Sequence, residues 1–167
     1  MARLFFAVWP DAPAARELAR VAQSLAELAG GKPMPAEKIH MTLAFLGSLD
    51  EEETGSAVAA AARVKGAPIA MAIDSVGSFR RARVGWAAPS QPNAELAALQ
   101  EALAGALRSR GFELEDRAFT PHATLVRKIA RAIPRAPMPA VEWRSRALTL
   151  VESTGDGRYE VMESWGF

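Results

Sequence analysis

The chain has 167 residues, half of them hydrophobic, so its length and composition are those of one globular domain with a sizeable core. The 20 lysine and arginine residues nearly balance the 19 aspartate and glutamate residues, which excludes a strong overall field that would attract a polyanion from a distance. Cysteine is absent, which excludes disulfides, thiol nucleophiles and thiolate metal sites and fits a cytoplasmic location.

An apolar run opens the chain, and residues 3–9 are typical of a buried strand. Pro10 and Asp11 interrupt this run well before the roughly eighteen residues that would cross a bilayer, so we expect a soluble protein without membrane contact. From Asp11 onwards, leucines at helical spacing predict a helix that ends at Gly30. A proline-containing loop then leads to a strand that is expected over about 38–46.

The middle of the chain adds a helix and two strands. A helix is predicted near residues 51–64, because Asp50 and Glu53 have the spacing of a capping box. Alternating apolar residues after Pro68 predict a strand, and a further strand is expected at about 83–88, after an arginine-rich loop.

The final third begins with a predicted helix. Leucines repeat every three or four residues after Asn93, and Gly111 is placed to end the helix. Pro121 introduces the next strand. Two alternating runs, at about 145–152 and 158–165, predict a β-hairpin at the end of the chain.

Both histidines stand in the same local sequence, His-x-Thr-Leu. The first copy contains His40 and Thr42, and the second contains His122 and Thr124, 82 positions later. Random placement of threonine and leucine would produce this match with odds of roughly one in 10⁵. The matched settings indicate a paired acid and base.

Strand geometry predicts where the motif side chains point. Residues i and i+2 share one face, so His40 and Thr42 are expected on one face while Met41, Leu43 and Phe45 are expected in the core. The same alternation applies to the second motif. Each strand would present an imidazole beside a hydroxyl group that donates hydrogen bonds to anions.

Two long segments share one order of elements. Residues 3–46 and 83–127 each contain a strand, a leucine-rich helix, a loop and a strand that begins with the motif. This degenerate repeat predicts two lobes, related by pseudo-two-fold symmetry, on either side of a cleft. Such symmetry would bring the two histidines together.

A pair of histidines suits displacement at phosphorus. Histidine titrates near neutral pH, so one imidazole accepts a proton while the other donates one. Two imidazoles on opposite sides of a phosphorus atom would activate the entering water and protonate the leaving sugar oxygen. The threonine hydroxyls would bind the non-bridging oxygens, where negative charge concentrates. No metal ion is required for this chemistry.

Other interpretations explain less of the pattern. A lone histidine at the start of a strand is often only a partly buried polar residue, but that explanation would have to hold for both histidines. A zinc or iron site usually needs a third ligand, and neither His-x-x-x-His nor His-x-x-Glu occurs. The sequence also lacks a Gly-x-Ser-x-Gly elbow and a Walker-type phosphate loop.

Three segments together are diagnostic: RLFFAVWP at Arg3–Pro10, IHMTLAFLG at Ile39–Gly47 and FTPHATLVR at Phe119–Arg127. With these segments the chain resembles the 2H phosphoesterases, which are named for two His-x-Thr/Ser-x motifs. It is most similar to the bacterial and archaeal RNA 2′,3′-cyclic phosphodiesterases, also called 2′-5′ RNA ligases. The likeness covers nearly the whole chain, so we expect residues 1–167 to form one domain of two pseudo-repeated lobes.

The resemblance implies a bilobal α+β fold, in which two antiparallel sheets flanked by helices form a central cleft. It implies hydrolysis of a 2′,3′-cyclic phosphate at an RNA end to leave a 2′-phosphate, without a cofactor. By position, His40 would donate the proton and His122 would accept it. Thr42, Thr124 and Arg127 would bind the phosphate. The expected partners are RNA ends or cyclic nucleotides, and a monomer is expected.

The chain departs from the family pattern at one position. Many relatives have lysine where this chain has Ala44, so a phosphate contact there is either missing or supplied by an arginine of the cluster at 80–83. Strict alternation also places Arg127 on the core side of its strand, so a bend is needed to turn it toward the phosphate. Among aromatic residues, Phe45, Phe119 or Trp86 could stack on a terminal base, although core packing is favoured for them.

Two other functions remain open from the sequence. One is a 2′-5′ RNA ligase, or a phosphodiesterase for 2′-5′ oligonucleotides or small cyclic nucleotides. The other is a module that binds RNA ends in the cleft without turnover, with the arginine clusters supplying salt-sensitive affinity.

Overall fold

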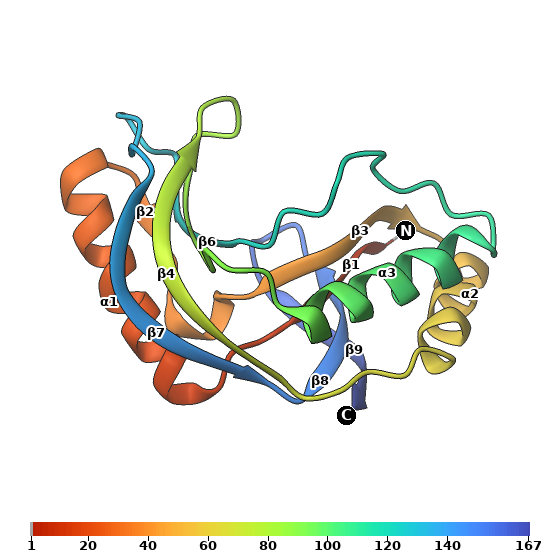
Figure 1. The fold of residues 1–167 in the computed structure, drawn as a ribbon. Coiled ribbons are helices and arrows are strands. Elements are labelled where there is room, and N and C mark those ends of the chain that lie inside the picture. The colour runs from red at the N-terminus through yellow and green to blue at the C-terminus, as the bar shows by residue number, and fades with distance from the viewer. Residues whose placement is uncertain (1) are drawn as a thin grey trace.

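The computed structural model of the protein describes residues 2–167, in which three α-helices pack on a large antiparallel sheet (Figure 1). The elements in chain order are β1 (Ala2–Val8), α1 (Ala12–Ala29), β2 (Lys32–Pro33), the 3₁₀ turn η1 (Ala36–Lys38), β3 (Met41–Leu49), α2 (Glu51–Ala62), β4 (Ile69–Phe79), β5 (Val84–Ala88), α3 (Ala94–Arg108), β6 (Ala123–Arg127), β7 (Ala136–Ser145), β8 (Ala147–Ser153) and β9 (Tyr159–Gly166).

The sheet consists of two halves that meet at one point. Its strand order is β7-β4-β5-β6-β3-β1-β8-β9, and the short β2 pairs with β6. At the centre, β6 and β3 are joined by a single antiparallel pair, Met41 with Ala123. The two expected antiparallel sheets are therefore continuous through this pair, and the α+β class is confirmed.

The two halves repeat one local arrangement. In the first, β1 pairs with β3 and α1 lies between them in sequence; in the second, β5 pairs with β6 and α3 lies between them. Each helix packs across the centre, because α1 contacts β6 and β7 while α3 contacts β3. Buried residues of both halves form one cluster that supports the two histidine-bearing strands. That residues 1–167 form a single domain stays a prediction.

Local signals at the helix ends are confirmed. Asp50 Oδ1 accepts from the Glu53 backbone N–H at 2.8 Å, and Glu53 Oε1 accepts from the Asp50 N–H at 3.1 Å, so the capping box is complete. Asn93 Oδ1 accepts from the Leu96 N–H at 2.9 Å and caps α3, whose leucine stripe is buried. Within residues 2–167, no helix combines the length and apolarity needed to cross a membrane.

The structure differs from the sequence-based expectation in three strands, of which the short β2 lies in the expected proline-containing loop. β7 was not predicted, because Pro137 and Pro139 interrupt its pattern; prolines are tolerated there because β7 is an edge strand. The strand expected over 38–46 begins only at Met41, since Ala36–Lys38 form a 3₁₀ turn. His40 therefore lies just before β3, two residues after the last residue of this turn.

Candidate active site

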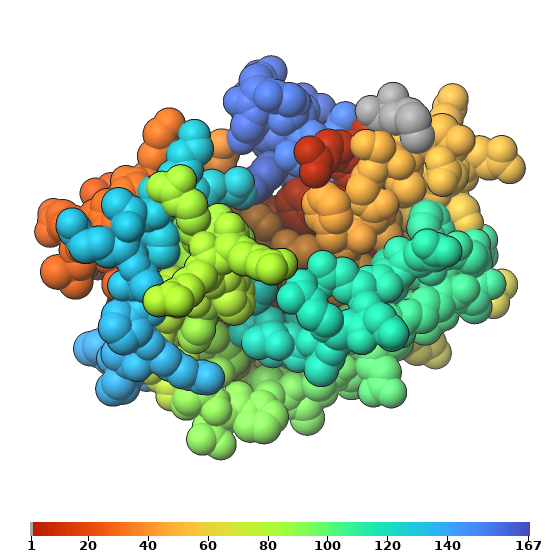
Figure 2. All heavy atoms as spheres, turned by 90° about the horizontal axis from the view of Figure 1, so that it is seen from above, coloured from red at the N-terminus to blue at the C-terminus, as the bar shows by residue number. Residues whose placement is uncertain are grey.

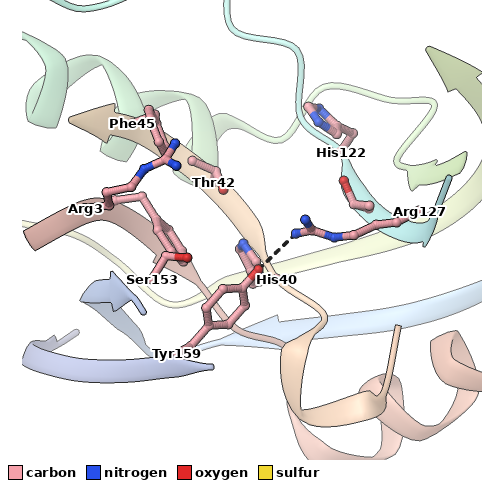
Figure 3. Close-up of a pocket in the computed structure, with 10 residues that line it drawn as sticks. Arg3, His40, Thr42, Phe45, His122, Arg127, Ser153 and Tyr159 are labelled. Carbon is pink, nitrogen blue, oxygen red and sulfur yellow. Dashed lines mark hydrogen bonds between the residues drawn. The ribbon is translucent and has the colours of Figure 1, made fainter. Parts of the chain in front are cut away.

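A cavity of about 290 Å³ lies beside the two central strands. Viewed from above, the surface is hollowed there, between the loops that follow β4 and β8 (Figure 2). The lining residues are Arg3, Phe5, His40, Thr42, Phe45, His122, Thr124, Arg127, Ser153 and Tyr159. All five residues singled out from the sequence are in this set, so the fold brings them to one place (Figure 3).

Both imidazoles are held by the same hydrogen bond. His40 Nδ1 donates to the carbonyl oxygen of Lys38 at 2.7 Å, and His122 Nδ1 donates to that of Thr120 at 2.8 Å. Because a carbonyl oxygen only accepts, Nδ1 carries a proton in both rings. Each ring therefore has Nε2 left for the cavity, where a neutral imidazole accepts a proton and an imidazolium donates one.

The pairing of Met41 with Ala123 explains why the two histidines and the two threonines of the motifs face the same cavity. Met41 and Ala123 are fully buried, so their side chains point into the core. Side chains alternate along a strand, and the residues on either side of this pair therefore point to the cavity. Extending the antiparallel register by one residue places the histidine of each strand opposite the threonine of the other.

Each motif contains a β-bulge directly after its threonine. The pairing of β1 with β3 skips Leu43, and the pairing of β5 with β6 skips Leu125. A bulge adds one residue to a strand, so it reverses the alternation beyond it. The residue three positions after each threonine consequently turns toward the cavity. It is Phe45 in β3 and Arg127 in β6.

The two bulges determine the directions of the Arg127 and Phe45 side chains, and so test the sequence-based expectations for both. The bend that Arg127 needs is present, whereas the expectation that Phe45 packs in the core is wrong, because 51% of this residue is exposed. The Arg3 guanidinium lies over the Phe45 ring, 5.7 Å from its centroid. Core packing is confirmed for Trp86, which is buried, and for Phe119, which packs against the main core.

Three aromatic rings surround His40. Trp9 stacks on the imidazole with the ring centroids 4.7 Å apart, and Phe5 stacks on it at 5.1 Å. Tyr159 meets the same imidazole edge-on at 5.4 Å. The Trp9 and Phe5 rings lie only 6.5 Å from each other, so they do not cover opposite faces of the imidazole, and the three rings shield it from water on one side.

Burial lowers the pKa of His40 from 6.5 to about 4. The hydrogen bond to the Lys38 carbonyl acts in the opposite direction, while the charges of Arg127 and His122 lower the pKa further. The imidazole of His40 is therefore uncharged at neutral pH, and a bound anion is needed to favour its protonated form.

His122 has different surroundings. Its ring meets Phe79, the last residue of β4, edge-on at 5.0 Å. Arg127 is the last residue of β6, the strand that His122 directly precedes, and its Nη2 donates to the Tyr159 hydroxyl at 3.1 Å (Figure 3). Tyr159 thus contacts both the His40 ring and the arginine of the opposite strand.

Sequence reasoning missed four lining residues: Arg3, Phe5, Ser153 and Tyr159. Two signals existed, since Tyr159 is the chain's one tyrosine and Arg3 is a charge at the start of an apolar strand. Their position depends on the pairing of Arg3 with Ser153 across β1 and β8, a contact between distant segments.

The cations at the cavity are Arg3 and Arg127 rather than the arginines at 80–83. Ala44 is buried and does not line the cavity. Within the described chain, no group of three or more acidic or histidine side chains is placed to hold a metal ion. That the chemistry requires no metal stays a prediction.

Two imidazoles that face one cavity from the central strands of a pseudo-symmetric antiparallel sheet define a two-histidine phosphoesterase. Comparison with known families agrees with this class. A family model described as LigT like Phosphoesterase matches residues 8–86 and 87–154, and the chain belongs to this family.

Similar proteins cover almost the whole chain. RNA 2′,3′-cyclic phosphodiesterase of Escherichia coli (strain K12) is 29% identical over 98% of this chain and 95% of its own length. RNA 2′,3′-cyclic phosphodiesterase of Thermus thermophilus is 31% identical over 90% of this chain and 81% of its own. The crystal structure of E. coli LigT complexed with 3′-AMP superposes with a TM-score of 0.89 at 28% identity, covering 99% of this chain and 97% of that chain.

Proposed function

We propose that this protein hydrolyses 2′,3′-cyclic phosphates at RNA ends to 2′-phosphomonoesters, with two histidines as acid and base and without a metal ion. The observation that carries this proposal is the matched fixation of both imidazoles, which leaves Nε2 of His40 and of His122 for one cavity. The names of the relatives and the 3′-AMP in the E. coli structure support a nucleotide substrate.

The reaction balances between the two rings. His122 Nε2 takes a proton from water while the water oxygen bonds to phosphorus. The bond from phosphorus to the 3′ oxygen breaks, and His40 Nε2 gives its proton to that oxygen. The product, which carries the 2′-phosphate, then leaves the cavity. At this point His122 is protonated and His40 is neutral, and proton exchange with solvent restores the starting state of both.

Three groups would stabilise the phosphoryl oxygens. Thr42 and Thr124 both line the cavity, and extending the register from the Met41–Ala123 pair puts each of them opposite the histidine of the other strand. Arg127 adds a charge-assisted donor at the same cavity. Because these donors already line the cavity before the substrate arrives, they favour the transition state, in which charge on the non-bridging oxygens increases.

The assignment of His40 as the donor sets a condition on its pKa. A phosphodiester carries a negative charge, and binding it beside the imidazole raises the pKa that burial has lowered.

A substrate whose leaving group needs no proton, such as a nitrophenyl ester, separates the role of the proton donor from that of the proton acceptor. It should restore the rate of His40→Ala but not that of His122→Ala, and the reverse result would exchange the roles.

The far end of the cavity suits a nucleobase. Phe45 exposes its ring there, and Arg3 covers that ring (Figure 3). Aromatic rings and guanidinium planes are the groups on which unpaired RNA bases stack. We place the base of the terminal nucleotide against this pair, with its cyclic phosphate between the histidines.

Product analysis tests the proposed reaction. The purified protein is incubated, with EDTA present, with RNA ending in a 2′,3′-cyclic phosphate, and the products are separated by chromatography. Conversion to the 2′-phosphate is the expected result. A joined 2′-5′ product would identify a ligase, and RNA binding without any product would identify an end-binding module; either outcome would contradict the proposal.

We further propose that the protein acts as a monomer in the cytoplasm. One chain carries both histidines, which supports a monomer, and the sequence has no cysteine, which fits the cytoplasm.

A further inference from the structure

Basic residues gather in two segments that contain no acidic residue. Residues 75–94 carry three arginines, and residues 117–141 carry four arginines and one lysine. Together the two segments hold eight of the chain's 20 basic residues and none of its 19 acidic ones. Because the chain as a whole is nearly neutral, this separation creates a local positive field rather than an overall one.

The fold places the two segments side by side. The backbone N–H of Ile129 donates to the Arg83 carbonyl at 3.1 Å, and Arg83 Nε donates to the Ile129 carbonyl at 3.1 Å. Ser78 Oγ also joins the loops, since it accepts from the Ile133 N–H at 2.8 Å and donates to the Ile133 carbonyl at 2.9 Å. Figure 1 shows the loops after β4 and β6 projecting together. The exposed basic residues of these loops are Arg80, Arg81, Arg83, Lys128, Arg131 and Arg135; Arg131 donates to the Leu28 carbonyl, and we call the other five the basic rim.

The basic rim has no internal counter-charge. In residues 2–167 the ion pairs join other residues, and none involves a member of the rim. Arg83 and Lys128 also have left-handed backbone, with φ of 55° and 56°, and they are the non-glycine residues of the described chain that do so. Such conformations are disfavoured and, where they are kept, gather at binding sites. The rim therefore offers fixed positive charge to an external anion.

The basic rim lies next to the cavity that contains the two histidines. Phe79 packs edge-on against His122 and is followed directly by Arg80. Lys128 follows Arg127, which lines the cavity. An RNA strand that leaves the cavity on the side of His122 therefore passes directly over the basic rim.

The opposite side of the cavity has the opposite charge. Residues 147–166, which form β8, β9 and their loop, carry four acidic residues and one basic residue. Lys38, which donates to the Gly157 carbonyl, and Arg3, which pairs with Ser153, partly offset these acidic charges, so a polyanion is attracted more strongly to the basic rim than to that side. The charge distribution thus selects one exit for an RNA strand.

We propose that the basic rim binds the sugar–phosphate backbone of the RNA strand on the 5′ side of the terminal nucleotide. This inference rests on the proposed function, in which the cyclic phosphate at the 3′ end occupies the cavity. The remainder of the strand is attached through the 5′ oxygen of that nucleotide, so it extends out of the cavity. The enzyme consequently prefers RNA chains to cyclic mononucleotides, which occupy the cavity without reaching the rim.

A triple variant tests the rim without touching the cavity. Arg80, Arg81 and Lys128 are exposed, and within the described chain their side chains make no hydrogen bond, so Arg80→Gln, Arg81→Gln and Lys128→Gln together should preserve the fold. The matched control is Arg16→Gln, Arg20→Gln and Arg63→Gln, which removes the same charge from α1 and the end of α2. The substrates are a short RNA ending in 2′,3′-cyclic phosphate and adenosine 2′,3′-cyclic monophosphate.

The rim variant should lose roughly tenfold or more in kcat/KM on the RNA and keep its kcat/KM on the mononucleotide. Each phosphate contact on a single strand contributes about 0.7 to the slope of log affinity against log salt, so three lost contacts should reduce that slope by about two. The control should match the wild type on both substrates. Equal losses on both substrates, or an unchanged salt slope, would overturn the inference.

Failure of the proposed function is a separate outcome. If the wild type cleaves neither substrate, the reaction is wrong. The rim is then tested by fluorescence anisotropy with the same RNA labelled at its 5′ end. Equal affinity of the wild type and the rim variant for this RNA would overturn the inference in that case as well.

Discussion

Trp9→Ala should raise the pKa of His40. In the wild type, burial among aromatic rings lowers this pKa from 6.5 to about 4. A difference of this size corresponds to about 3 kcal/mol between the charged and the neutral imidazole. Trp9 is the aromatic neighbour closest to the ring, with a centroid distance of 4.7 Å. Its removal admits water to one face of the imidazole, so we expect a rise of about one pKa unit or more toward 6.5.

NMR titration of the imidazole protons is the direct assay. The chain has two histidines, so it gives two sets of ring signals, and His122→Ala assigns them. Trp9→Phe is the matched control, because it keeps an aromatic ring against His40 and should shift the midpoint less than Trp9→Ala does. A wild-type midpoint near 6.5, or equal midpoints in the wild type and Trp9→Ala, would refute the reasoning.

The same pKa predicts a pH dependence of stability. Between pH 6.5 and about 4 the unfolded chain binds a proton at His40 that the native protein does not bind, so the free energy of unfolding decreases as the pH falls. The loss from this residue approaches about 3 kcal/mol at pH 4 and is absent above pH 7. Urea unfolding of the wild type and His40→Gln at both pH values isolates this contribution. An identical pH dependence in the two proteins would contradict it.

Two further predictions concern the donors and the support of the cavity. Thr42→Val and Thr124→Val keep the side-chain shape but remove a phosphate donor, so each should lower kcat/KM about 100-fold in steady-state kinetics; full activity of either variant would exclude that threonine as a donor. Gly31→Ala should destabilise the protein by about 2–4 kcal/mol in urea unfolding, because Gly31 has φ of +98° and an added Cβ would collide with the carbonyl oxygen of Arg127. Gly105→Ala is the control, since a Cβ there meets no atom within 4 Å and a helical alanine is favourable; equal effects at both glycines would contradict the collision.

Short-range features were predictable because the interacting residues are close in sequence. Asp50 and Glu53 are three residues apart, and both hydrogen bonds of their capping box form. Spacing alone also placed the buried leucines of α3. The meeting of the two histidines was predictable for a different reason: a repeated order of elements around a repeated motif implies a symmetric pair of strands.

Features that depend on strand pairing were not predictable. The bulges at Leu43 and Leu125 are visible only in the register of neighbouring strands, and they reverse the faces of the residues that follow. Alternation therefore gave the wrong face for Phe45 and required an unexplained bend at Arg127. Tyr159 reaches the cavity because β9 pairs with β8, which pairs with β1, so its role depends on contacts between distant segments.

The central claim is that His40 and His122 act as one acid–base unit, and single-turnover rates of the two alanine variants test it most directly. With a 2′,3′-cyclic-phosphate-ended RNA and EDTA present, each single variant should lose about 10²–10⁴-fold. The double variant should lose little more than the slower single variant, since residues that act as a unit are not additive. A single variant that keeps a tenth or more of the wild-type rate, or losses that multiply in the double variant, would contradict the account.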